Sequence, residues 1–469
     1  MNNNFDVKYS LQRLCMIKNC LKVFTSNFIL LILGIVNTFV FPALMSIQDY
    51  ASYQEYMLYI SYTNICHLGI ASGMFLNYAG KKYEDTDKSQ YKSEIFLIYI
   101  VLSVFTIIGL CFAGCSHSVK LLYVALTIFP MCLIASFQAL QQAWEQFTSY
   151  AIINALPKIL FTFLAILYFF AAKNLTSNFV ILTYLVLQWI FCLFFINKFF
   201  KFTKNSRSYK IFSKENLKTS TDGFLITLGN YINLLFHAID KQFVNWFYSI
   251  FSFSIYSFAM SMQSIMMVFI TALANPFYPR LAKSDVTPEM LSELKELLLM
   301  FGAYSGCAYF VVSFFIKHFI TKYTASVDVV CIFFAVFPAM AVINVLYINL
   351  YRIRRLLKKY ILTLILMLAI SAVLNGIAVY FKSDYIGISL ATLISYYIWL
   401  IYSQKHFPDI KITTKDYLYL AGFFVIYIAS KLLTNEIIGF VAYGIIITVW
   451  NYFVYKNSAK IFINKIQKR

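Results

Sequence analysis

The sequence predicts an all-α, polytopic membrane protein with about 14 transmembrane helices. Of its 469 residues, 61% are hydrophobic and only 13% are charged, whereas soluble domains carry roughly 45–50% apolar and about 25% charged residues. The apolar residues form runs of about 20, the length that a helix needs to cross the bilayer core. A membrane β-barrel would instead show alternating segments of about ten residues. The composition therefore excludes an ordinary soluble enzyme and a disordered chain.

Fourteen apolar runs are candidate membrane spans. The first run starts near Val23 and lacks a small-residue cleavage motif, so we do not expect a cleavable signal peptide. The second, fourth and seventh runs carry the most polar residues. The runs lie near residues 23–46, 53–78, 93–114, 120–143, 150–172, 178–198, 220–240, 251–275, 293–316, 327–350, 360–381, 385–403, 416–433 and 437–455.

Basic residues are distributed unevenly between the two sides of the predicted membrane. If the N-terminus is cytoplasmic, 32 of the 39 Lys and Arg residues fall in cytoplasmic segments, with Lys158 counted among them. Cytoplasmic loops of membrane proteins carry such an excess, so we expect both termini to be cytoplasmic. The net charge of +19 then reflects these loops and does not indicate nucleic-acid binding.

The fourteen spans are predicted to form two six-helix lobes around a central cavity, followed by two C-terminal helices. Residues 199–219 are the most hydrophilic connection and form a basic cytoplasmic linker. The linker separates an N-lobe at 1–198 from a C-lobe at 220–404, and residues 405–469 hold spans 13 and 14 and a basic tail. Two lobes that start on the same side of the membrane would be parallel repeats.

Motifs for enzymatic chemistry are absent from the sequence. It contains no P-loop, no GxSxG and no HExxH motif, and its loops are too short for a soluble catalytic domain. The nine cysteines form no CxxC pair and the five histidines are dispersed, so we expect no metal site and no cofactor. Activity must therefore come from residues in the membrane or at its edges.

Polar residues in the seventh span are the clearest candidates for a substrate site. Asn230, Asn233, His237 and Asp240 fall on one helix face, because residues three and four apart share a face. Polar groups at membrane depth are costly and usually face a cavity. We interpret this stripe as the wall of a water-accessible cleft; the alternative is hydrogen bonding between helices. Asp240 and the adjacent Lys241 are candidates for ion coupling, or for an ion pair in the outer interface.

Other candidates lie in the second and fourth spans and at cytoplasmic helix ends. The basic ones would suit a phosphate group, although headgroup anchoring is the commoner role. For the polar ones the alternatives are a buried neutral histidine and a solvated helix end. These candidates are Asn64 and His67 in the second span, Gln138 and Gln141 in the fourth, and Lys81, Lys82 and Arg280 at cytoplasmic ends.

Two parts of the chain carry short motifs that occur together in one family of exporters. The first motif consists of Asp240, Lys241, Tyr256, Ala259, Pro279 and Arg280. The second consists of Leu68, Gly69, Ile70 and Gly73. With these motifs the sequence resembles the Wzx-type polysaccharide repeat-unit flippases of the MOP/MATE-like superfamily. Lys241 stands where that family usually has Arg, and Asn77 replaces a usual cation.

The resemblance implies a function as well as a fold. Such a protein would flip undecaprenyl-pyrophosphate-linked oligosaccharides for O-antigen, capsule or related glycans across the bacterial inner membrane by alternating access. It would use an ion gradient and would work beside a polysaccharide polymerase and a chain-length regulator. The alternatives are a MATE-like drug/cation antiporter, a membrane polysaccharide polymerase, which is an enzyme, and a lipid II flippase of the same fold.

Overall fold

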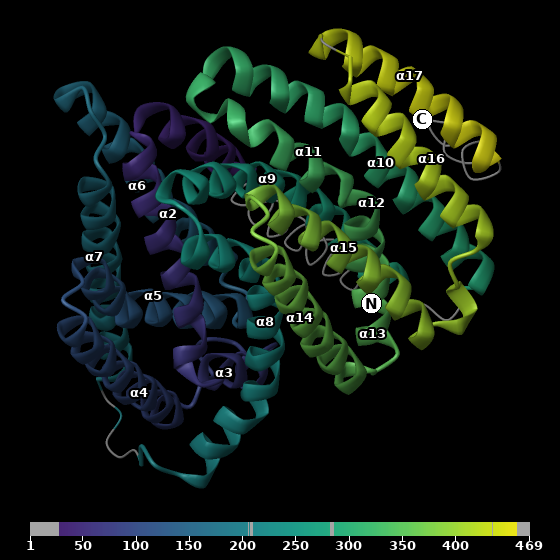
Figure 1. The fold of residues 1–469 in the computed structure, drawn as a ribbon. Coiled ribbons are helices and arrows are strands. Elements are labelled where there is room, and N and C mark those ends of the chain that lie inside the picture. The colour runs from purple at the N-terminus through teal and green to yellow at the C-terminus, as the bar shows by residue number, and fades with distance from the viewer. Residues whose placement is uncertain (1–27, 205, 207–209, 282–285, 434, 457–469) are drawn as a thin grey trace, which may run out of the picture. The chain divides into compact units, whose positions relative to one another are not determined.

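The computed structural model describes residues 28–204, 206, 210–281, 286–433 and 435–456, which form helices and no strand (Figure 1). The predicted all-α fold class is therefore confirmed. A first helix covers Phe28–Leu44. The other helices are α2 (Ile47–Tyr62), η1 (Thr63–His67), α3 (Ile70–Tyr78), α4 (Lys88–Cys115), α5 (Val119–Ala143), α6 (Phe147–Ala172), α7 (Ser177–Thr203), α8 (Lys214–Phe247), α9 (Ile250–Leu281), α10 (Pro288–Phe319), η2 (Thr321–Ser326), α11 (Val327–Ala335), α12 (Phe337–Ala341), η3 (Val342–Tyr347), α13 (Ile348–Ile353), α14 (Leu357–Tyr380), α15 (Tyr385–Ser403), η4 (Gln404–His406), η5 (Pro408–Ile410), α16 (Thr414–Lys431) and α17 (Glu436–Val454).

The chain divides into two compact units, Met1–Leu234 and Leu235–Arg469. The division falls within α8, so this helix begins in the first unit and ends in the second. Each unit has its own buried core, and each is described below by itself. The predicted arrangement of two six-helix lobes, a linker at 199–219 and an added helix pair stays a prediction.

Nine helices among the described residues are long and apolar enough to cross a membrane, or ten if one bent pair counts as a single span. The pair comprises Thr321–Ala335 and Phe337–Ile353, which meet at 44°. The nine helices coincide with nine of the fourteen predicted runs. The described parts of the other five runs also form helices, but these are short, broken, bent or polar. The exact number of fourteen spans therefore stays a prediction.

The second predicted span is broken in its middle. Helix α2 passes into the 3-10 turn η1, and the chain then enters α3 through Leu68 and Gly69, which have φ angles of 46° and 81°. This left-handed backbone is costly for residues that have a Cβ atom, and glycine adopts it without strain. The apolar run is therefore continuous in sequence while the helix is not.

The core of the first unit lies between α3, α4, α5 and α7 and is rich in aromatic rings. Trp144 at the end of α5 contacts Tyr78, Tyr83 and Tyr91, with ring centroids 4.9–5.7 Å apart. Edge-to-face and tilted ring pairs of this kind add roughly 0.5–1.5 kcal/mol each beyond their area burial. The cluster joins the end of α3, the segment after it, the start of α4 and the end of α5.

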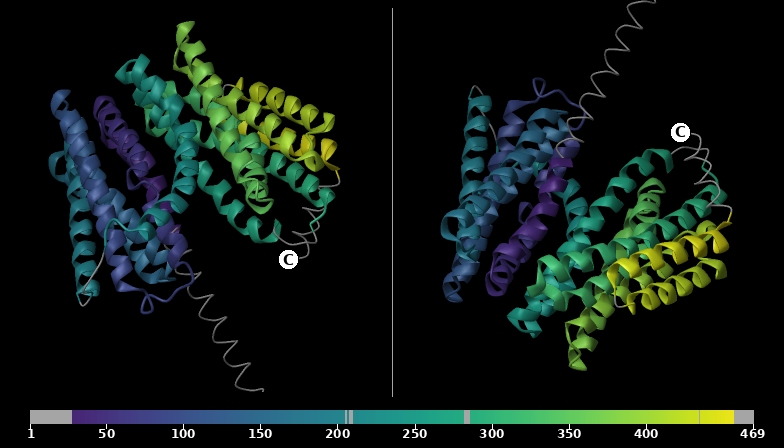
Figure 2. Two further views of the ribbon diagram at one scale, coloured as in Figure 1. Left: turned by 90° about the horizontal axis from the view of Figure 1, so that it is seen from below. Right: turned by 90° about the horizontal axis from the view of Figure 1, so that it is seen from above.

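In the second unit, α16 and α17 lie side by side against α10, as both views of Figure 2 show. A buried ion pair between Lys295 of α10 and Asp416 of α16 connects them, with 2.6 Å between the charged atoms and 1% exposure of each side chain. The hydroxyl of Tyr443 in α17 donates to the carbonyl of Ala303 in α10 at 2.6 Å. These polar contacts fix the C-terminal helix pair to the rest of the unit.

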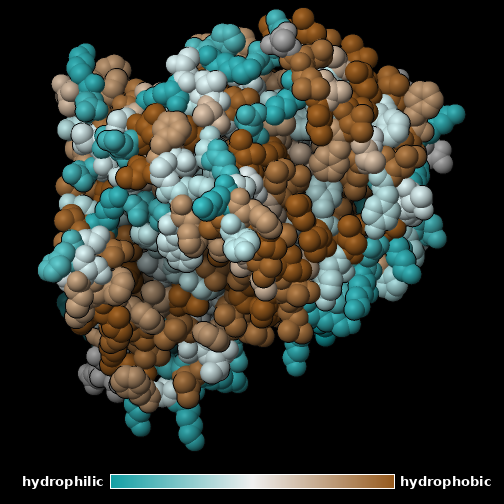
Figure 3. All heavy atoms as spheres, viewed as in Figure 1, coloured by the Kyte–Doolittle hydropathy of each residue, from teal (hydrophilic) through white to brown (hydrophobic). Residues whose placement is uncertain are grey.

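The outer sides of the helices are apolar, and brown hydrophobic side chains cover wide areas of the face in Figure 3. Large apolar side chains are exposed on both units, among them Phe163 at 60%, Phe170 at 66% and Val425 at 68%. Water would penalise such a surface, whereas lipid chains cover it at no cost. The described residues thus form a multi-span membrane protein.

Candidate functional site

A buried carboxylate, Asp240, connects three helices of the second unit. It lies in the last third of α8 and is 3% exposed. Its Oδ2 atom accepts hydrogen bonds from the Tyr256 hydroxyl of α9 at 2.9 Å and from the Thr392 hydroxyl of α15 at 3.0 Å. Burying a carboxylate is costly unless hydrogen bonds satisfy it. The two hydroxyls supply that compensation, so Tyr256, one of the motif residues, acts on Asp240 directly.

Two basic side chains accompany this carboxylate on α8. Lys241 is 8% exposed, and its amine lies 5.5 Å from the centre of the Phe253 ring, within the range of a cation–π contact. The Nδ1 atom of His237 shares a hydrogen bond of 2.7 Å with the Tyr396 hydroxyl of α15. Asp240 and His237, which have hydroxyl partners, and Lys241, which lies over an aromatic ring, thus form one polar cluster on α8. Such a cluster can hold or exchange a proton or a small cation.

The first half of the predicted stripe lies on the part of α8 that belongs to the first unit. Asn230 is exposed, and Asn233 is half-buried. The Oδ1 atom of Asn233 is buried without a hydrogen-bond partner among the described residues. That both face a central cavity stays a prediction.

Three glycines hold α3 and α8 in direct backbone contact within the first unit. A Cβ atom added to Gly73 would lie 1.9 Å from the carbonyl oxygen of Thr219, and one added to Gly223 would lie 2.1 Å from that of Gly69. Small residues allow helix backbones to approach closely in membranes. The hydroxyl of Ser220 donates to the carbonyl of Leu68 at 2.9 Å and fastens the crossing. The motif residues Leu68, Gly69 and Gly73 therefore have a packing role here.

The candidates of the second span sit in the break between α2 and α3. The Nδ1 atom of His67 accepts a hydrogen bond from the backbone N–H of Gly69 at 3.2 Å. The imidazole therefore satisfies a backbone donor that the interrupted helix leaves free. Asn64 is half-buried one turn earlier. Any substrate role for His67 competes with this local contact.

Sequence reasoning did not single out Glu94, which is the most buried acid of the first unit among the described residues. It is 1% exposed and accepts hydrogen bonds from the Tyr78 hydroxyl at 2.8 Å, the Thr219 hydroxyl at 3.1 Å and the Gln90 amide at 3.2 Å. Asn77 donates in turn to Thr219 at 2.9 Å. The network joins α3, α4 and α8. The only signal in the sequence was an acid placed just inside an apolar run.

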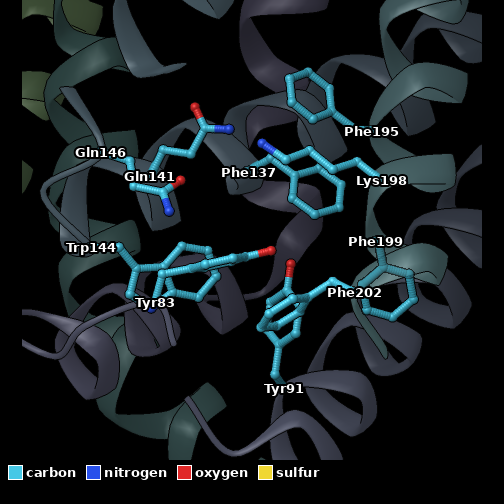
Figure 4. Close-up of a pocket in the computed structure, with 10 residues that line it drawn as sticks. All are labelled: Tyr83, Tyr91, Phe137, Gln141, Trp144, Gln146, Phe195, Lys198, Phe199 and Phe202. Carbon is cyan, nitrogen blue, oxygen red and sulfur yellow. The ribbon is translucent and has the colours of Figure 1, made fainter. Parts of the chain in front are cut away.

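Gln141 lines a pocket at the end of α5 that faces α4 and α7 (Figure 4). The side chain is 4% exposed, and its Oε1 atom has no hydrogen-bond partner among the described residues. Figure 4 shows the amine of Lys198 directed across the pocket and the hydroxyls of Tyr83 and Tyr91 directed into it. The pocket spans about 330 Å³, part of which is open to the surroundings. Ordered water suits these polar groups. The lining residues are Tyr83, Tyr91, Phe137, Gln141, Trp144, Gln146, Phe195, Lys198, Phe199 and Phe202.

Gln138, one turn earlier on α5, lines a different cavity, between α5, α6 and α7. This cavity spans about 440 Å³, part of which is open to the surroundings, and is also lined by Lys158. Lys158 is the twelfth of the 26 residues of α6. The predicted span 150–172 also contains Lys158, and its assignment to the cytoplasmic side in the count of basic residues stays a prediction.

The predicted phosphate-binding cations are found at two helix ends. Lys81 and Lys82 are exposed after α3, and the amine of Lys81 lies 5.8 Å from the centre of the Tyr78 ring. Arg280 is near the end of α9, and its side chain lies outside the described residues. Their proposed contact with a phosphate stays a prediction. No group of three or more metal-binding side chains occurs in the described part of the chain.

Comparison with solved structures shows which fold this is. The chain is similar to a solved structure of "Lipid II flippase MurJ, inward closed conformation", with a TM-score of 0.64 over 96% of this chain and 99% of that one, at 16% sequence identity. A second solved chain, named "protein A", gives a TM-score of 0.46 at 15% identity, over 83% of this chain and 94% of that one. No protein-family model and no curated protein matches the sequence. The chain therefore has the fold of the MurJ structure.

Proposed function

We propose that the protein flips a lipid-linked oligosaccharide across the bacterial inner membrane by alternating access, with both termini in the cytoplasm. The observation that carries this proposal is the fold likeness to a lipid II flippase, which extends over 96% of this chain and 99% of that one. A fold alone does not determine function. The polar side chains of the helices supply the second support, because polar groups within membrane spans usually serve transport.

The substrate would place its polar head between polar helix faces and leave its lipid tail in the bilayer. Cations at cytoplasmic helix ends, Lys81, Lys82 and Arg280, would attract the pyrophosphate. Amides such as Asn230 and Asn233 would exchange hydrogen bonds with sugar hydroxyls. No covalent step is needed, since reorientation alone carries the head to the other side.

The finer proposal is a Wzx-type role, in which the substrate is an undecaprenyl-pyrophosphate-linked repeat unit of O-antigen, capsule or a related glycan. Its support is the motif that includes Asp240, Tyr256 and Arg280. A polysaccharide polymerase and a chain-length regulator would be the partners. Lipid II itself is the second candidate, favoured because the solved MurJ structure that shares the fold is that of a lipid II flippase. A drug/cation antiporter and a polymerase have no comparable support.

Energy for transport would come from an ion that binds in the cluster of Asp240, Lys241 and His237. A carboxylate held by hydroxyls from α9 and α15 responds to any movement of these helices, because the hydrogen bonds must break or form. Binding of a proton or a cation would favour one arrangement over the other by its differential affinity.

Two complementation assays separate the candidate substrates. The gene is expressed in a strain depleted of its lipid II flippase and in a strain that lacks its repeat-unit flippase. Growth of the first strain supports lipid II, and restored surface glycan in the second supports the repeat-unit substrate. Failure in both strains, with normal membrane abundance, contradicts flipping of either undecaprenyl-linked substrate.

Variants of Asp240 test the ion-coupling cluster in whichever strain responds. Asp240→Asn keeps the shape and removes the charge, and we expect it to reduce export at least tenfold at equal membrane abundance. Asp328→Asn is the matched control, because Asp328 also pairs with a side chain of the second unit, Lys431, but is 57% exposed. Equal export by the two variants would remove the role of Asp240.

A further inference from the structure

Glu94 is a buried acid that pairs with no cation in the described part of the chain. It is the seventh residue of α4 and is 1% exposed. None of the ion pairs among the described residues includes it. Burying an ionised carboxylate is costly unless hydrogen bonds or an opposite charge compensate it. The hydrogen bonds from Tyr78, Gln90 and Thr219 therefore carry the whole compensation when Glu94 is charged.

The hydroxyl of Thr219 can serve Glu94 in two ways. Its Oγ1 atom lies 3.1 Å from the Oε1 atom of Glu94 and also 3.1 Å from the backbone carbonyl oxygen of Glu215. A hydroxyl has one proton and two lone pairs, so the same proton can be directed to either oxygen. The amide of Asn77 donates to this hydroxyl at 2.9 Å and occupies one lone pair. The other lone pair can accept a hydrogen bond from a protonated carboxyl group.

The network is therefore complete with and without a proton on Glu94. In the ionised state, Thr219 and Gln90 donate to Oε1 and Tyr78 donates to Oε2. In the protonated state, Oε1 donates to the Thr219 hydroxyl, which donates in turn to the carbonyl of Glu215. Only one hydroxyl proton has to turn between these states. No buried polar group loses its partner, so neither state carries the penalty of an unpaired group.

The charged and titratable groups around Glu94 do not fix its charge. Tyr78 of α3 and Tyr91 of α4 face it, and phenols are uncharged near neutral pH because their ordinary pKa is about 10. Helix α5 packs against α4 and has no charged residue in its second half. The remaining charges at this end of the unit are exposed or half-buried, so water and salt screen them. They include Lys88 and Lys92 of α4, Lys201 of α7, and Lys214, Glu215 and Lys218 of α8.

We propose that Glu94 is a proton-binding site of the first unit, which takes up and releases one proton as the Thr219 hydroxyl turns. The geometry selects a proton over a metal ion, because the side-chain groups directed at the carboxylate are hydrogen-bond donors and would repel a metal cation. In the proposed flippase, this site would couple proton movement to transport separately from Asp240. That coupling role rests on the proposed function, whereas proton binding itself does not.

Infrared difference spectra of the purified full-length protein, recorded between mildly alkaline and mildly acidic buffer, test proton binding. We expect the carbonyl stretching band of a buried, protonated carboxylic acid to appear in acid, and Glu94→Gln should lose the intensity of one group per chain. Glu84→Gln is the matched control, because Glu84 is an exposed acid between α3 and α4, and it should keep the band. Proton binding is overturned if the spectra of Glu94→Gln and wild type agree.

Hydrogen exchange separates a proton site from a purely structural carboxylate. Glu94→Gln resembles the protonated state, because its amide can donate to Thr219 and accept from Tyr78, so exchange in α3 and at the start of α8 should stay close to that of the wild type. Glu94→Leu leaves buried donors unpaired and should speed this exchange at least tenfold. Equally fast exchange in both variants would overturn the proposal, since the fold would then need the charge.

The coupling role is tested in whichever complementation strain responds to the wild type. Glu94→Gln should reduce export at least tenfold at equal membrane abundance, and Glu84→Gln should not. Unchanged export in Glu94→Gln would overturn the coupling role. Failure of the wild type in both strains would count against the proposed function alone, because the infrared and exchange measurements need no transport.

Discussion

Removal of one partner from the buried Lys295–Asp416 pair should release the C-terminal helix pair from α10. In Lys295→Met, the Asp416 carboxylate stays buried at 1% exposure and keeps only neutral donors, the hydroxyls of Thr413 and Tyr455 and the backbone N–H of Thr413. Breaking a buried ion pair on one side costs about 3–5 kcal/mol. The open state is the one in which the C-terminal helix pair is detached from α10. Because each 1.4 kcal/mol is about a factor of ten in an equilibrium, the population of this open state should rise by roughly a hundredfold to a few thousandfold.

A second ion pair between the same two helices is the internal control. Lys415 of α16 and Glu296 of α10 lie 3.2 Å apart, but their side chains are 46% and 17% exposed. Exposed pairs contribute about 0–1 kcal/mol, so Lys415→Met should change the open population by less than about fivefold. The two substitutions remove the same functional group from the same helix contact and differ mainly in burial.

Hydrogen exchange of the α16 and α17 amides, measured by mass spectrometry, reports this opening. We expect much faster exchange in Lys295→Met than in Lys415→Met, with α4 and α5 unchanged in both. The double variant Lys295→Met/Asp416→Asn should recover at least half of the protection, because no charge is then stranded. Equal effects of the two single variants, or no recovery in the double variant, would refute the reasoning from burial.

Two further predictions concern the glycine crossing and an interfacial ion pair. Gly73→Ala should destabilise the first unit by about 1–3 kcal/mol through overpacking. Gly376→Ala is the control and should be neutral or stabilising, because a Cβ atom there meets nothing within 4 Å. Thermal unfolding of the purified variants measures both effects, and equal melting temperatures of the two variants would contradict the close contact at Gly73. Arg354 donates to Asp409 at 2.9 Å, and this hydrogen bond lowers the pKa of Asp409 from its ordinary value. A lowered pKa means that the pair stabilises the fold above the ordinary pKa of about 3.9 and that this stabilisation is lost as the pH falls through the folded value. The free energy of local opening at η5, measured by hydrogen exchange, should therefore differ between wild-type and Arg354→Gln protein by at most about 1 kcal/mol at pH 7. This difference should vanish as the pH falls below the lowered pKa of Asp409. A difference that persists at that pH would contradict the role of the ion pair.

The helices were predictable because the signal for them is local. A run of about 20 apolar residues needs a helix in lipid, whatever its neighbours are. Nine runs became long apolar helices for this reason. The break between α2 and α3 depends instead on the left-handed conformation of Leu68 and Gly69. Hydropathy does not record that conformation, so the second span was predicted as continuous.

The candidate site was predictable only in part, because partners come from distant helices. The face of α8 that holds His237 and Asp240 follows from helical periodicity, but the hydroxyls of Tyr256 and Thr392 that satisfy Asp240 belong to α9 and α15. Glu94 was missed for the same reason, since its network depends on residues 16 and 125 positions away.

The side on which Lys158 lies could not be inferred from a loop. Counting basic residues by side assumes that each charge lies in a loop, whereas Lys158 lies within α6 and lines a cavity. Gln138 and Gln141 also show that a shared helix face does not predict a shared cavity, since these residues are one turn apart and line two separate cavities.

The two ion pairs between α10 and α16 have opposite polarity: α10 supplies the lysine of one pair and the acid of the other. This arrangement has a consequence for assembly. Lys295 and Glu296 are neighbours on one helix, and Asp416 and Lys415 face them from the other. A shift of α16 by one residue would place Lys295 opposite Lys415 in one direction, or Glu296 opposite Asp416 in the other. Repulsion between the like charges would disfavour either shifted arrangement. These four side chains therefore favour one register for the docking of the C-terminal helix pair on α10.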